Sequence, residues 1–375
     1  MLPEVDRIVR DQFWDPKLKG VDWKGAVARA AQELASARTP AEKDGAYDRL
    51  LALLNDSHTF RVAPGRLPPS AWGTVGLRIG QEGDGYAVKG LLPGSPAERA
   101  GLKPGDRILS IDGKTYGTER VNFRDLFLVF EGPVGSVLPV TYAPAGQAER
   151  TVTLTRTLEE PGDALVWKSA RVVHQDGRRY GYVHLWGFSA QTALAIVDLL
   201  LDREEVAGAG KELSEWGSIE GLLLDLRGNS GGYDPNILAS FLLGCWTRGD
   251  YYAVTREGRR LVPPEYKPLP TALLIDSGTA SQGETLTIQF RRHRIGPIVG
   301  EPTSGMASGG ASAQTLSDGS QLWISRRALE DADGKSYEGR GISPDVPAPD
   351  RPSATPGGED QVVEAAIKAL AEKGR

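Results

Sequence analysis

The chain has 375 residues, of which 40% are hydrophobic and 25% are charged, and its formal net charge is −5. This length predicts two or three domains, and the composition is typical of a soluble protein without an apolar run that spans a bilayer. The negative charge argues against nucleic acid as a partner.

Cysteine and histidine usage restricts the chemistry further. Cys245 is the only cysteine, which excludes an internal disulfide and any metal site built from several cysteines. The four histidines do not occur at metal-ligand spacing, so neither a metal nor another cofactor is expected. The chain opens without the basic and apolar regions of a secretory leader, which fits a cytoplasmic protein or one whose leader has been removed.

Residues 1–68 are expected to form an N-terminal helical region. Apolar residues recur at helical spacing from Val5, and Thr39–Glu42 reads as a capping box that begins a later helix. That helix ends before Asn55–Thr59, which contains Ser57 and His58. A histidine after a helix is more often a surface or capping residue. His58 is nevertheless a candidate general base, because a base must be near its nucleophile only in space.

Residues 70–156 change to short strands and glycine-rich turns, with a hairpin turn at Asp112-Gly113. The stretch Gly94–Gly113 resembles a PDZ domain along its whole length. The resemblance implies a carboxylate-binding loop, whose free amides hold the C-terminus of a peptide that adds as a strand to the sheet edge. Its residues are Gly73, Thr74, Val75, Gly76 and Leu77. The alternative is a PDZ domain that has lost peptide binding and serves only as a scaffold.

Residues 157–346 alternate between strands and helices, which predicts a layered α/β core. The charged segment 204–218 is expected at the surface. The strand that begins at Gly221 runs into a glycine-rich turn that lacks the lysine of a phosphate-binding loop. The amides of Gly231 and Gly232 in this turn are instead expected to face an oxyanion.

Ser281 lies between a short apolar run, Leu273–Ile275, and a predicted helix over residues 281–292. At such a junction the backbone amides are unpaired and the helix dipole is positive. Ser281 is therefore a candidate nucleophile, with the amide of Gln282 directed at a developing oxyanion. The alternative is that Ser281 is an N-cap and that Glu284 completes a capping box.

The ordered motifs Asp225–Gly232, Gly278–Ser281 and Gly339–Asp345, together with the PDZ stretch, resemble the carboxyl-terminal processing (tail-specific) peptidases, a family related to the tricorn core protease. The resemblance implies an α/β (α+β) fold with a ClpP/crotonase-like core, an inserted PDZ domain and the N-terminal helical region. Residues 347–375 would add a proline-rich linker and a C-terminal helix.

The same resemblance implies a serine endopeptidase that acts near protein C-termini. Ser281 would be its nucleophile, and its partners would be proteins or peptides with free C-termini. It also implies a place in the cell envelope, the periplasm or outside the cell. The sequence leaves the oligomeric state undetermined.

The chain departs from the processing peptidases at the position of their general-base lysine, where it has Met306. Methionine accepts no proton, so a serine–lysine pair is excluded unless Met306 replaces a native lysine. The tricorn-like branch uses a Ser-His pair and a late glutamate, which match Ser57, His58 and Glu338. In that reading His58 takes the proton of Ser281, while Ser57 and Glu338 fix its tautomer. The alternatives are an inactive or weakened peptidase that holds C-terminal peptides and, ranked last, a carrier of small hydrophobic molecules like the interphotoreceptor retinoid-binding proteins.

Overall fold

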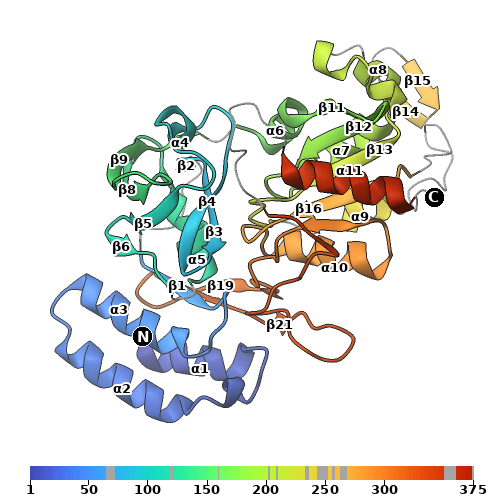
Figure 1. Cartoon of the computed structure of the whole chain (residues 1–375). Coiled ribbons are helices and arrows are strands. Elements are labelled where there is room, and N and C mark those ends of the chain that lie inside the picture. Colours follow the sequence, from blue (N-terminus) through green and yellow to red (C-terminus); the bar gives the residue numbers. More distant parts are fainter. Residues whose placement is uncertain are drawn as a thin grey trace. The chain divides into compact units, whose positions relative to one another are not determined.

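The computed structural model divides the chain into two compact units (Figure 1). The first comprises residues 1–159 and 304–341, and the second comprises residues 160–303 and 342–375. The structure describes residues 1–64, 72–118, 121–158, 160–201, 203–207, 210–232, 236–242, 252–255, 258–261, 268–349 and 360–373. The predicted boundary between residues 68 and 70, and residues 350–358 of the predicted linker, lie outside this description.

Three helices begin the first unit, as the sequence predicts: α1 (Leu2–Gln12), α2 (Trp23–Ser36) and α3 (Pro40–Ala52). The capping box at α3 is present, because the Thr39 hydroxyl accepts the Glu42 amide and the Glu42 carboxylate accepts the Thr39 amide. The apolar faces of these helices pack on a small antiparallel sheet in the order β1–β20–β19. Its strands are β1 (Phe60–Val62), β19 (Ser312–Thr315) and β20 (Gln321–Ile324).

The pairing of β1 with β20 explains one difference from the predicted domain boundaries. Residues 304–341, predicted within the core domain, belong to the first unit by their contacts. They also contain the two-stranded sheet of β18 (Ser308–Gly309) and β21 (Arg327–Ala328). A late segment of the chain therefore lies beside β1 and the residues that precede it.

The PDZ part of the first unit is a sheet in the order β3–β4–β5–β8–β9, with β6 paired to β5. Asp112 and Gly113 make the predicted turn between β5 and β6, with φ angles of 50° and 78°. A second small sheet has the order β10–β2–β7. The elements are β2 (Trp72–Thr74), β3 (Leu77–Glu82), β4 (Gly85–Leu91), α4 (Pro96–Arg99), β5 (Arg107–Ile111), β6 (Lys114–Thr115), α5 (Phe123–Leu126), β7 (Glu131–Pro133), β8 (Val137–Ala143), β9 (Arg150–Thr155) and β10 (Thr157–Leu158).

The second unit is built on a sheet in the order β11–β12–β13–β16–β17–β22, in which only the β11–β12 pair is antiparallel. Such a parallel sheet is stable when helices cover both faces. The strands are β11 (Arg171–Gln175), β12 (Arg178–His184), β13 (Gly221–Asp225), β16 (Thr271–Ile275), β17 (Ile298–Gly300) and β22 (Val346–Pro347). A separate hairpin joins β14 (Tyr252–Thr255) and β15 (Gly258–Leu261).

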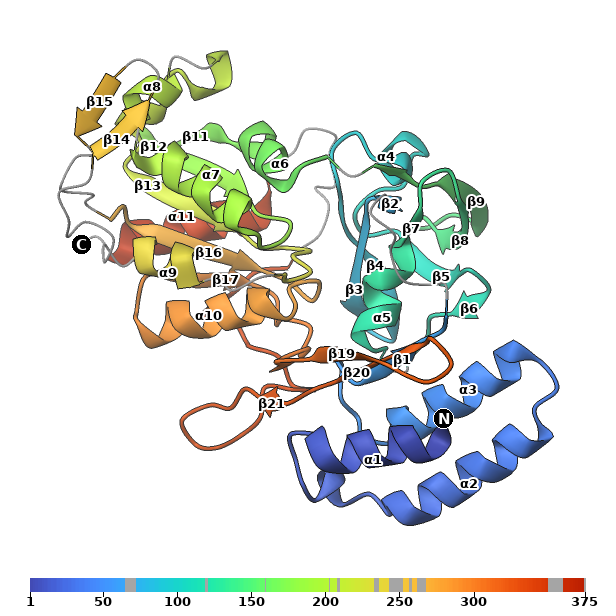
Figure 2. The ribbon, with the colours of Figure 1, turned by 180° about the vertical axis from the view of Figure 1, so that it is seen from behind.

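Helices cover this sheet on both faces, which the two opposite views show (Figures 1 and 2). One face packs against α11 (Gln361–Lys373) through buried residues such as Leu274 and Ile367. The other face packs against α7 (Ala190–Leu201), α9 (Asn236–Leu242) and α10 (Gln282–Arg292). The helices α6 (Gly162–Ser169) and α8 (Arg203–Ala207) complete the unit. This layered arrangement confirms the predicted α/β core.

The segment 204–218 was expected at the surface, and this expectation is wrong for part of it. Trp216 is fully buried in the same core as α7, and its indole N–H donates to the Leu199 carbonyl at 2.6 Å. Leu213 is also buried. The high charge of the segment hides these two apolar anchors, which lie in short 3₁₀ turns. Among the residues that the structure describes, no helix is long and apolar enough to cross a bilayer.

Candidate active site

Ser281 lies at the junction between β16 and α10 in a backbone conformation that few residues adopt. Its φ is 52° and its ψ is −115°, a combination that costs a residue other than glycine about 1–3 kcal/mol. The Ser281 hydroxyl accepts no hydrogen bond from the described amides of α10. The Ser281 carbonyl, by contrast, accepts the amides of Glu284 and Thr285. The alternative that Ser281 is an ordinary N-cap is therefore wrong. A strained serine whose hydroxyl does not cap the helix is a suitable nucleophile.

Asp276 ties the serine turn to the glycine-rich turn after β13. Its buried carboxylate accepts the amide of Gly228 at 2.8 Å and that of Gly278 at 3.0 Å. The amide of Ala280 also donates to the carbonyl of Asn229 at 2.9 Å. These hydrogen bonds hold the two turns together.

The glycine-rich turn approaches Ser281 closely, and only glycine fits there. A Cβ atom on Gly231 would lie 2.6 Å from the Cβ of Ser281 and 2.9 Å from the amide nitrogen of Gln282. The Gly231 amide, however, donates to the side-chain oxygen of Asn229 at 2.8 Å. The prediction that Gly231 supplies an oxyanion donor is therefore wrong, because its proton is already used by a buried side chain.

Two of the predicted oxyanion donors remain. Gln282 is the first residue of α10, and the amide at this position has no acceptor within its own helix. Gly232 is exposed and has a φ of 126°, which suits glycine alone. The roles of Gly232 and Gln282 stay predictions that this local geometry permits.

A buried ion pair supports the glycine-rich turn at the end of β13. Burial by itself disfavours the charged Asp225, but the Arg227 guanidinium beside it, at 2.5 Å, holds the pKa of Asp225 well below its usual range. Arg227 also bonds Asp360, just before α11. Burial lowers the pKa of His184, although the Asp225 charge opposes this shift. The ring is therefore neutral, with Nε2 at 2.8 Å from the Arg227 carbonyl.

His58 lies in the first unit, where the structure brings it together with Ser57 and Glu338. The Ser57 hydroxyl lies 2.9 Å from Nδ1 of His58 and donates to Glu338 at 3.0 Å. Glu338 also accepts the amide of Ser57 at 2.8 Å. On its face, the imidazole stacks on Phe123, with ring centroids 4.8 Å apart. The Ser57 contact in the ring plane and the Phe123 contact on the ring face together fix the orientation of the imidazole.

Three residues that the sequence analysis missed join this cluster: Asp56, Ser308 and Ser325. Ser308 Oγ lies 3.3 Å from Nδ1 of His58 and 3.2 Å from the Asp56 carboxylate, and Ser325 Oγ donates to Asp56 at 2.6 Å. Asp56 directly precedes the Ser-His pair, so its position in the sequence could have indicated its place in the cluster. Ser308 and Ser325 come from a distant part of the chain, so only the β1–β20 pairing brings them here.

Met306, at the position where the resemblance predicts a lysine, is almost completely buried, with 2% of its surface exposed. Its amide donates to the hydroxyl of Ser304 at 3.3 Å. Gly305 before it contacts the turn that follows Glu338, because its carbonyl accepts the amide of Gly339 at 2.8 Å. An apolar side chain is therefore packed where a proton acceptor was expected.

The predicted carboxylate-binding loop is part of the folded PDZ domain. Gly73 and Thr74 lie in β2 and pair with residues of β7 and β10 on either side. The Gly76 amide donates to the Thr74 hydroxyl at 3.0 Å, and Val75 and Leu77 are fully buried. The Gly76 amide could therefore bind a carboxylate only after it leaves the Thr74 hydroxyl.

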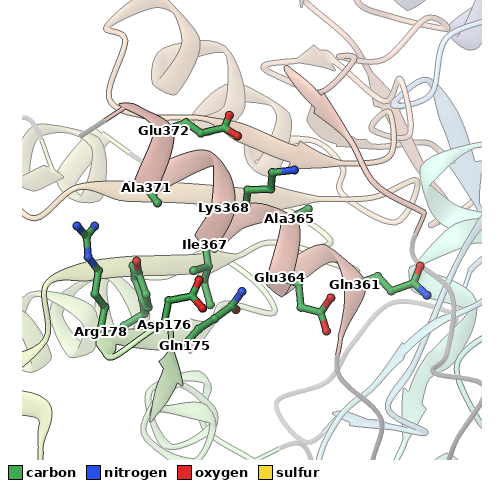
Figure 3. Close-up of a pocket in the computed structure, with 11 residues that line it drawn as sticks. Gln175, Asp176, Arg178, Gln361, Glu364, Ala365, Ile367, Lys368, Ala371 and Glu372 are labelled. Carbon is green, nitrogen blue, oxygen red and sulfur yellow. The ribbon is translucent and has the colours of Figure 1, made fainter. Parts of the chain in front are cut away.

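The second unit has a surface hollow between α11 and the turn that joins β11 to β12 (Figure 3). Charges of both signs line it, including Asp176, Arg178, Glu364 and Lys368, and no predicted site residue is among them. Among the described residues there is also no group of three or more His, Cys, Asp or Glu side chains that could hold a metal ion.

The parallel sheet covered by helices, with the strained serine and a glycine-rich turn at the ends of its strands, defines the fold class: a ClpP/crotonase-like core with a PDZ domain. The family model of Peptidase family S41 matches residues 179–348, that of the PDZ domain matches residues 88–126, and that of the tricorn protease C1 domain matches residues 1–43. The C-terminal processing peptidase of Tetradesmus obliquus chloroplasts is 30% identical over 80% of this chain and 67% of its own length. The chain belongs to peptidase family S41.

Other relatives are longer than this chain. Two tricorn protease homologues of Streptomyces coelicolor are 27% and 28% identical over 98% of the chain, but the chain spans only 32% and 34% of their lengths. The carboxyl-terminal-processing peptidase 2 of Arabidopsis thaliana chloroplasts is 29% identical, and the chain spans 60% of it.

Solved structures agree on the fold. The photosystem II D1 C-terminal processing protease matches with a TM-score of 0.62 at 24% identity, over 99% of this chain and 95% of that one. The tricorn protease matches with a TM-score of 0.54 at 20% identity, over 100% of this chain and 36% of that one.

Proposed function

We propose that the chain is a serine endopeptidase that cleaves proteins or peptides at or near their C-termini through an acyl-enzyme on Ser281. The observation that carries this proposal is the conformation of Ser281, which is strained and does not cap α10. Membership of peptidase family S41 supports the same reaction, and the names of the relatives support the choice of substrate end.

In the proposed reaction the Ser281 hydroxyl attacks the scissile carbonyl, and His58 takes its proton through Nε2. The amides of Gly232 and Gln282 stabilise the oxyanion. The imidazolium then protonates the leaving amine, and water hydrolyses the acyl-enzyme by the same route. The contacts of Ser57 and Glu338 support His58 as the base, because they occupy Nδ1 and leave Nε2 to take the proton.

The test uses an unstructured protein substrate and a fluorophosphonate probe with the parent chain and the Ser281→Ala variant. The proposal predicts cleavage and one covalent adduct at Ser281 in the parent, and neither in the variant. Equal cleavage by both proteins contradicts it. If the parent neither cleaves nor labels while it still binds C-terminal peptides, the alternative of an inactive peptide-binding module is correct.

We also propose that the PDZ domain recognises the substrate C-terminus along β3. The support is the position of β3 at the edge of its sheet, where an added strand can pair. Calorimetry with one peptide in two forms tests this. The form with a free, apolar C-terminal residue should bind more tightly than the amidated form, since Gly73–Leu77 would hold the carboxylate. Equal affinities would leave the domain as a scaffold.

A further inference from the structure

The imidazole of His58 faces two hydroxyl groups at Nδ1, where the resemblance predicts one. Ser57 Oγ lies 2.9 Å from Nδ1, and Ser308 Oγ lies 3.3 Å from it. The two hydroxyl oxygens are themselves 3.2 Å apart. Ser57 and Ser308 are each 2% exposed, so water does not compete for these contacts.

Each hydroxyl is held by a different carboxylate. Ser57 Oγ donates to Glu338 at 3.0 Å, while Ser308 Oγ donates to Asp56 at 3.2 Å. The Ser308 amide donates to Glu338 at 2.7 Å, and this bond links the Ser308–Asp56 pair to the Ser57–Glu338 pair. Both carboxylates belong to the first unit: Asp56 directly precedes Ser57, and Glu338 lies in the segment that follows Met306.

Asp56 is itself held firmly. It accepts hydrogen bonds from Ser325 Oγ at 2.6 Å, Thr59 Oγ1 at 2.9 Å, the Trp14 indole at 3.0 Å and the His58 amide at 3.1 Å. Asp56 is 7% exposed. A buried carboxylate with this many donors is fixed in place.

Counting the protons determines the tautomer. Each serine hydroxyl has one hydrogen, and in this network Ser57 and Ser308 give theirs to the carboxylates. With this assignment their lone pairs face Nδ1, and the tautomer that fits the network carries its ring hydrogen on Nδ1. Nε2 is thereby left as the acceptor, which is the form that a general base needs.

We propose that Asp56 and Ser308 are positioning residues that form a second carboxylate–hydroxyl pair on His58, parallel to Glu338 and Ser57. This inference rests on the proposed function of His58. The two pairs share one task, because either hydroxyl can accept the Nδ1 hydrogen when the other is absent. They also place two negative charges behind the imidazolium that forms in the reaction.

The experiment measures the rate of fluorophosphonate labelling of Ser281 against pH in the full chain. The variants are Ser57→Ala, Ser308→Ala, the double variant and Asp56→Asn. Each serine variant alone should slow labelling by about fivefold, and the double variant by roughly a hundredfold or more, because only the double variant leaves Nδ1 without an acceptor. Ser308→Thr keeps the hydroxyl and should restore the parent rate.

A purely structural role for these residues predicts another pattern. Asp56→Asn removes a charge that stabilises the imidazolium, so the midpoint of the pH profile should move to lower pH as well as the rate falling. Ser320→Ala is the matched control. It removes another fully buried hydroxyl of the first unit that donates to a carboxylate, Asp318, but Ser320 makes none of the described contacts to His58. Its labelling rate and midpoint should equal those of the parent.

The outcomes separate the two proposals. Suppose that the parent labels and that His58→Ala abolishes labelling. If the effects of the two single serine variants then simply add in the double variant, and Asp56→Asn leaves the midpoint unchanged, the role of Asp56 and Ser308 is refuted while the proposed function stands. If the parent does not label at all, the proposed function fails with it. If Ser308→Ala does not fold, Asp56→Asn and Ser308→Thr still decide the question through the midpoint.

Discussion

Asp276 accepts the amide hydrogen of Gly228 at 2.8 Å, and this bond connects the turn that carries Ser281 to the glycine-rich turn after β13. The two turns follow β16 and β13, which are neighbouring parallel strands. The carboxyl ends of parallel strands are a common place for active sites, because loops from adjacent strands meet there. In this chain the buried carboxylate of Asp276 links the two loops.

Replacing Asp276 by asparagine should therefore weaken both stability and catalysis. The charge that accepts the amides of Gly228 and Gly278 is lost, which lowers the free energy of unfolding by about 1–3 kcal/mol. Urea titration measures this change. Asp176→Asn is the matched control, since Asp176 is exposed, and should change stability by less than about 0.5 kcal/mol. A loss of equal size in both variants would contradict the role of Asp276.

The backbone strain at Ser281 predicts an unusual order of stabilities. Ser281→Ala and Ser281→Gly both remove the hydroxyl and should both be inactive. Glycine adopts the φ of 52° without a steric penalty, whereas alanine does not. The glycine variant should therefore unfold with a free energy about 1 kcal/mol higher than that of the alanine variant. Thermal melting of the two variants checks this, and a less stable glycine variant would show that the site is not strained.

Gly231→Ala should remove activity through a steric clash. Its new Cβ would lie 2.6 Å from Ser281 Cβ, and its φ of 88° already disfavours alanine. Gly135→Ala isolates the second effect, because Gly135 has a φ of 84° and nothing within 4 Å of the added atom. We expect Gly231→Ala to be less stable than Gly135→Ala by about 1–3 kcal/mol and inactive. Similar stability and retained cleavage in both variants would argue against close contact between the turns.

The buried His184 predicts how stability depends on pH. Its pKa is lowered in the folded state, so below the ordinary histidine value of about 6.5 the unfolded chain binds the proton more readily. The free energy of unfolding should therefore be highest above this pH and fall as the pH drops below it.

His184→Gln should remove this part of the slope, because glutamine can donate to the Arg227 carbonyl but does not titrate. His174→Gln is the control, since His174 is 62% exposed in its side chain, and it should leave the slope unchanged. Urea unfolding at pH 7.5 and at pH 5.5 compares the variants. An identical slope in His184→Gln and in the parent would contradict the assignment.

The sequence predicted the local features well and the contacts between distant segments only in part. The capping box at Thr39, the hairpin turn at Asp112 and the strand–turn–helix around Ser281 depend on neighbouring residues, and each is present. Ser308 beside His58 was not predictable, because its position depends on the pairing of β1 with β20 across more than half of the chain. The donated amide of Gly231 was missed for a related reason, since a nearby asparagine competes for it.

Cleavage of one peptide substrate by four proteins tests the assigned base most directly: the parent, His58→Ala, Glu338→Gln and Met306→Lys. If His58 is the base, kcat/KM of the parent should rise with pH through the histidine range, since a neutral imidazole is required. His58→Ala should then lose most activity at every pH, because the variant lacks the group that takes the proton of Ser281. Glu338→Gln should lower activity while Ser281 stays in place, and Met306→Lys should bring no gain. Retained activity in His58→Ala together with a large gain in Met306→Lys would contradict this assignment and identify a lysine-type enzyme that has lost its base.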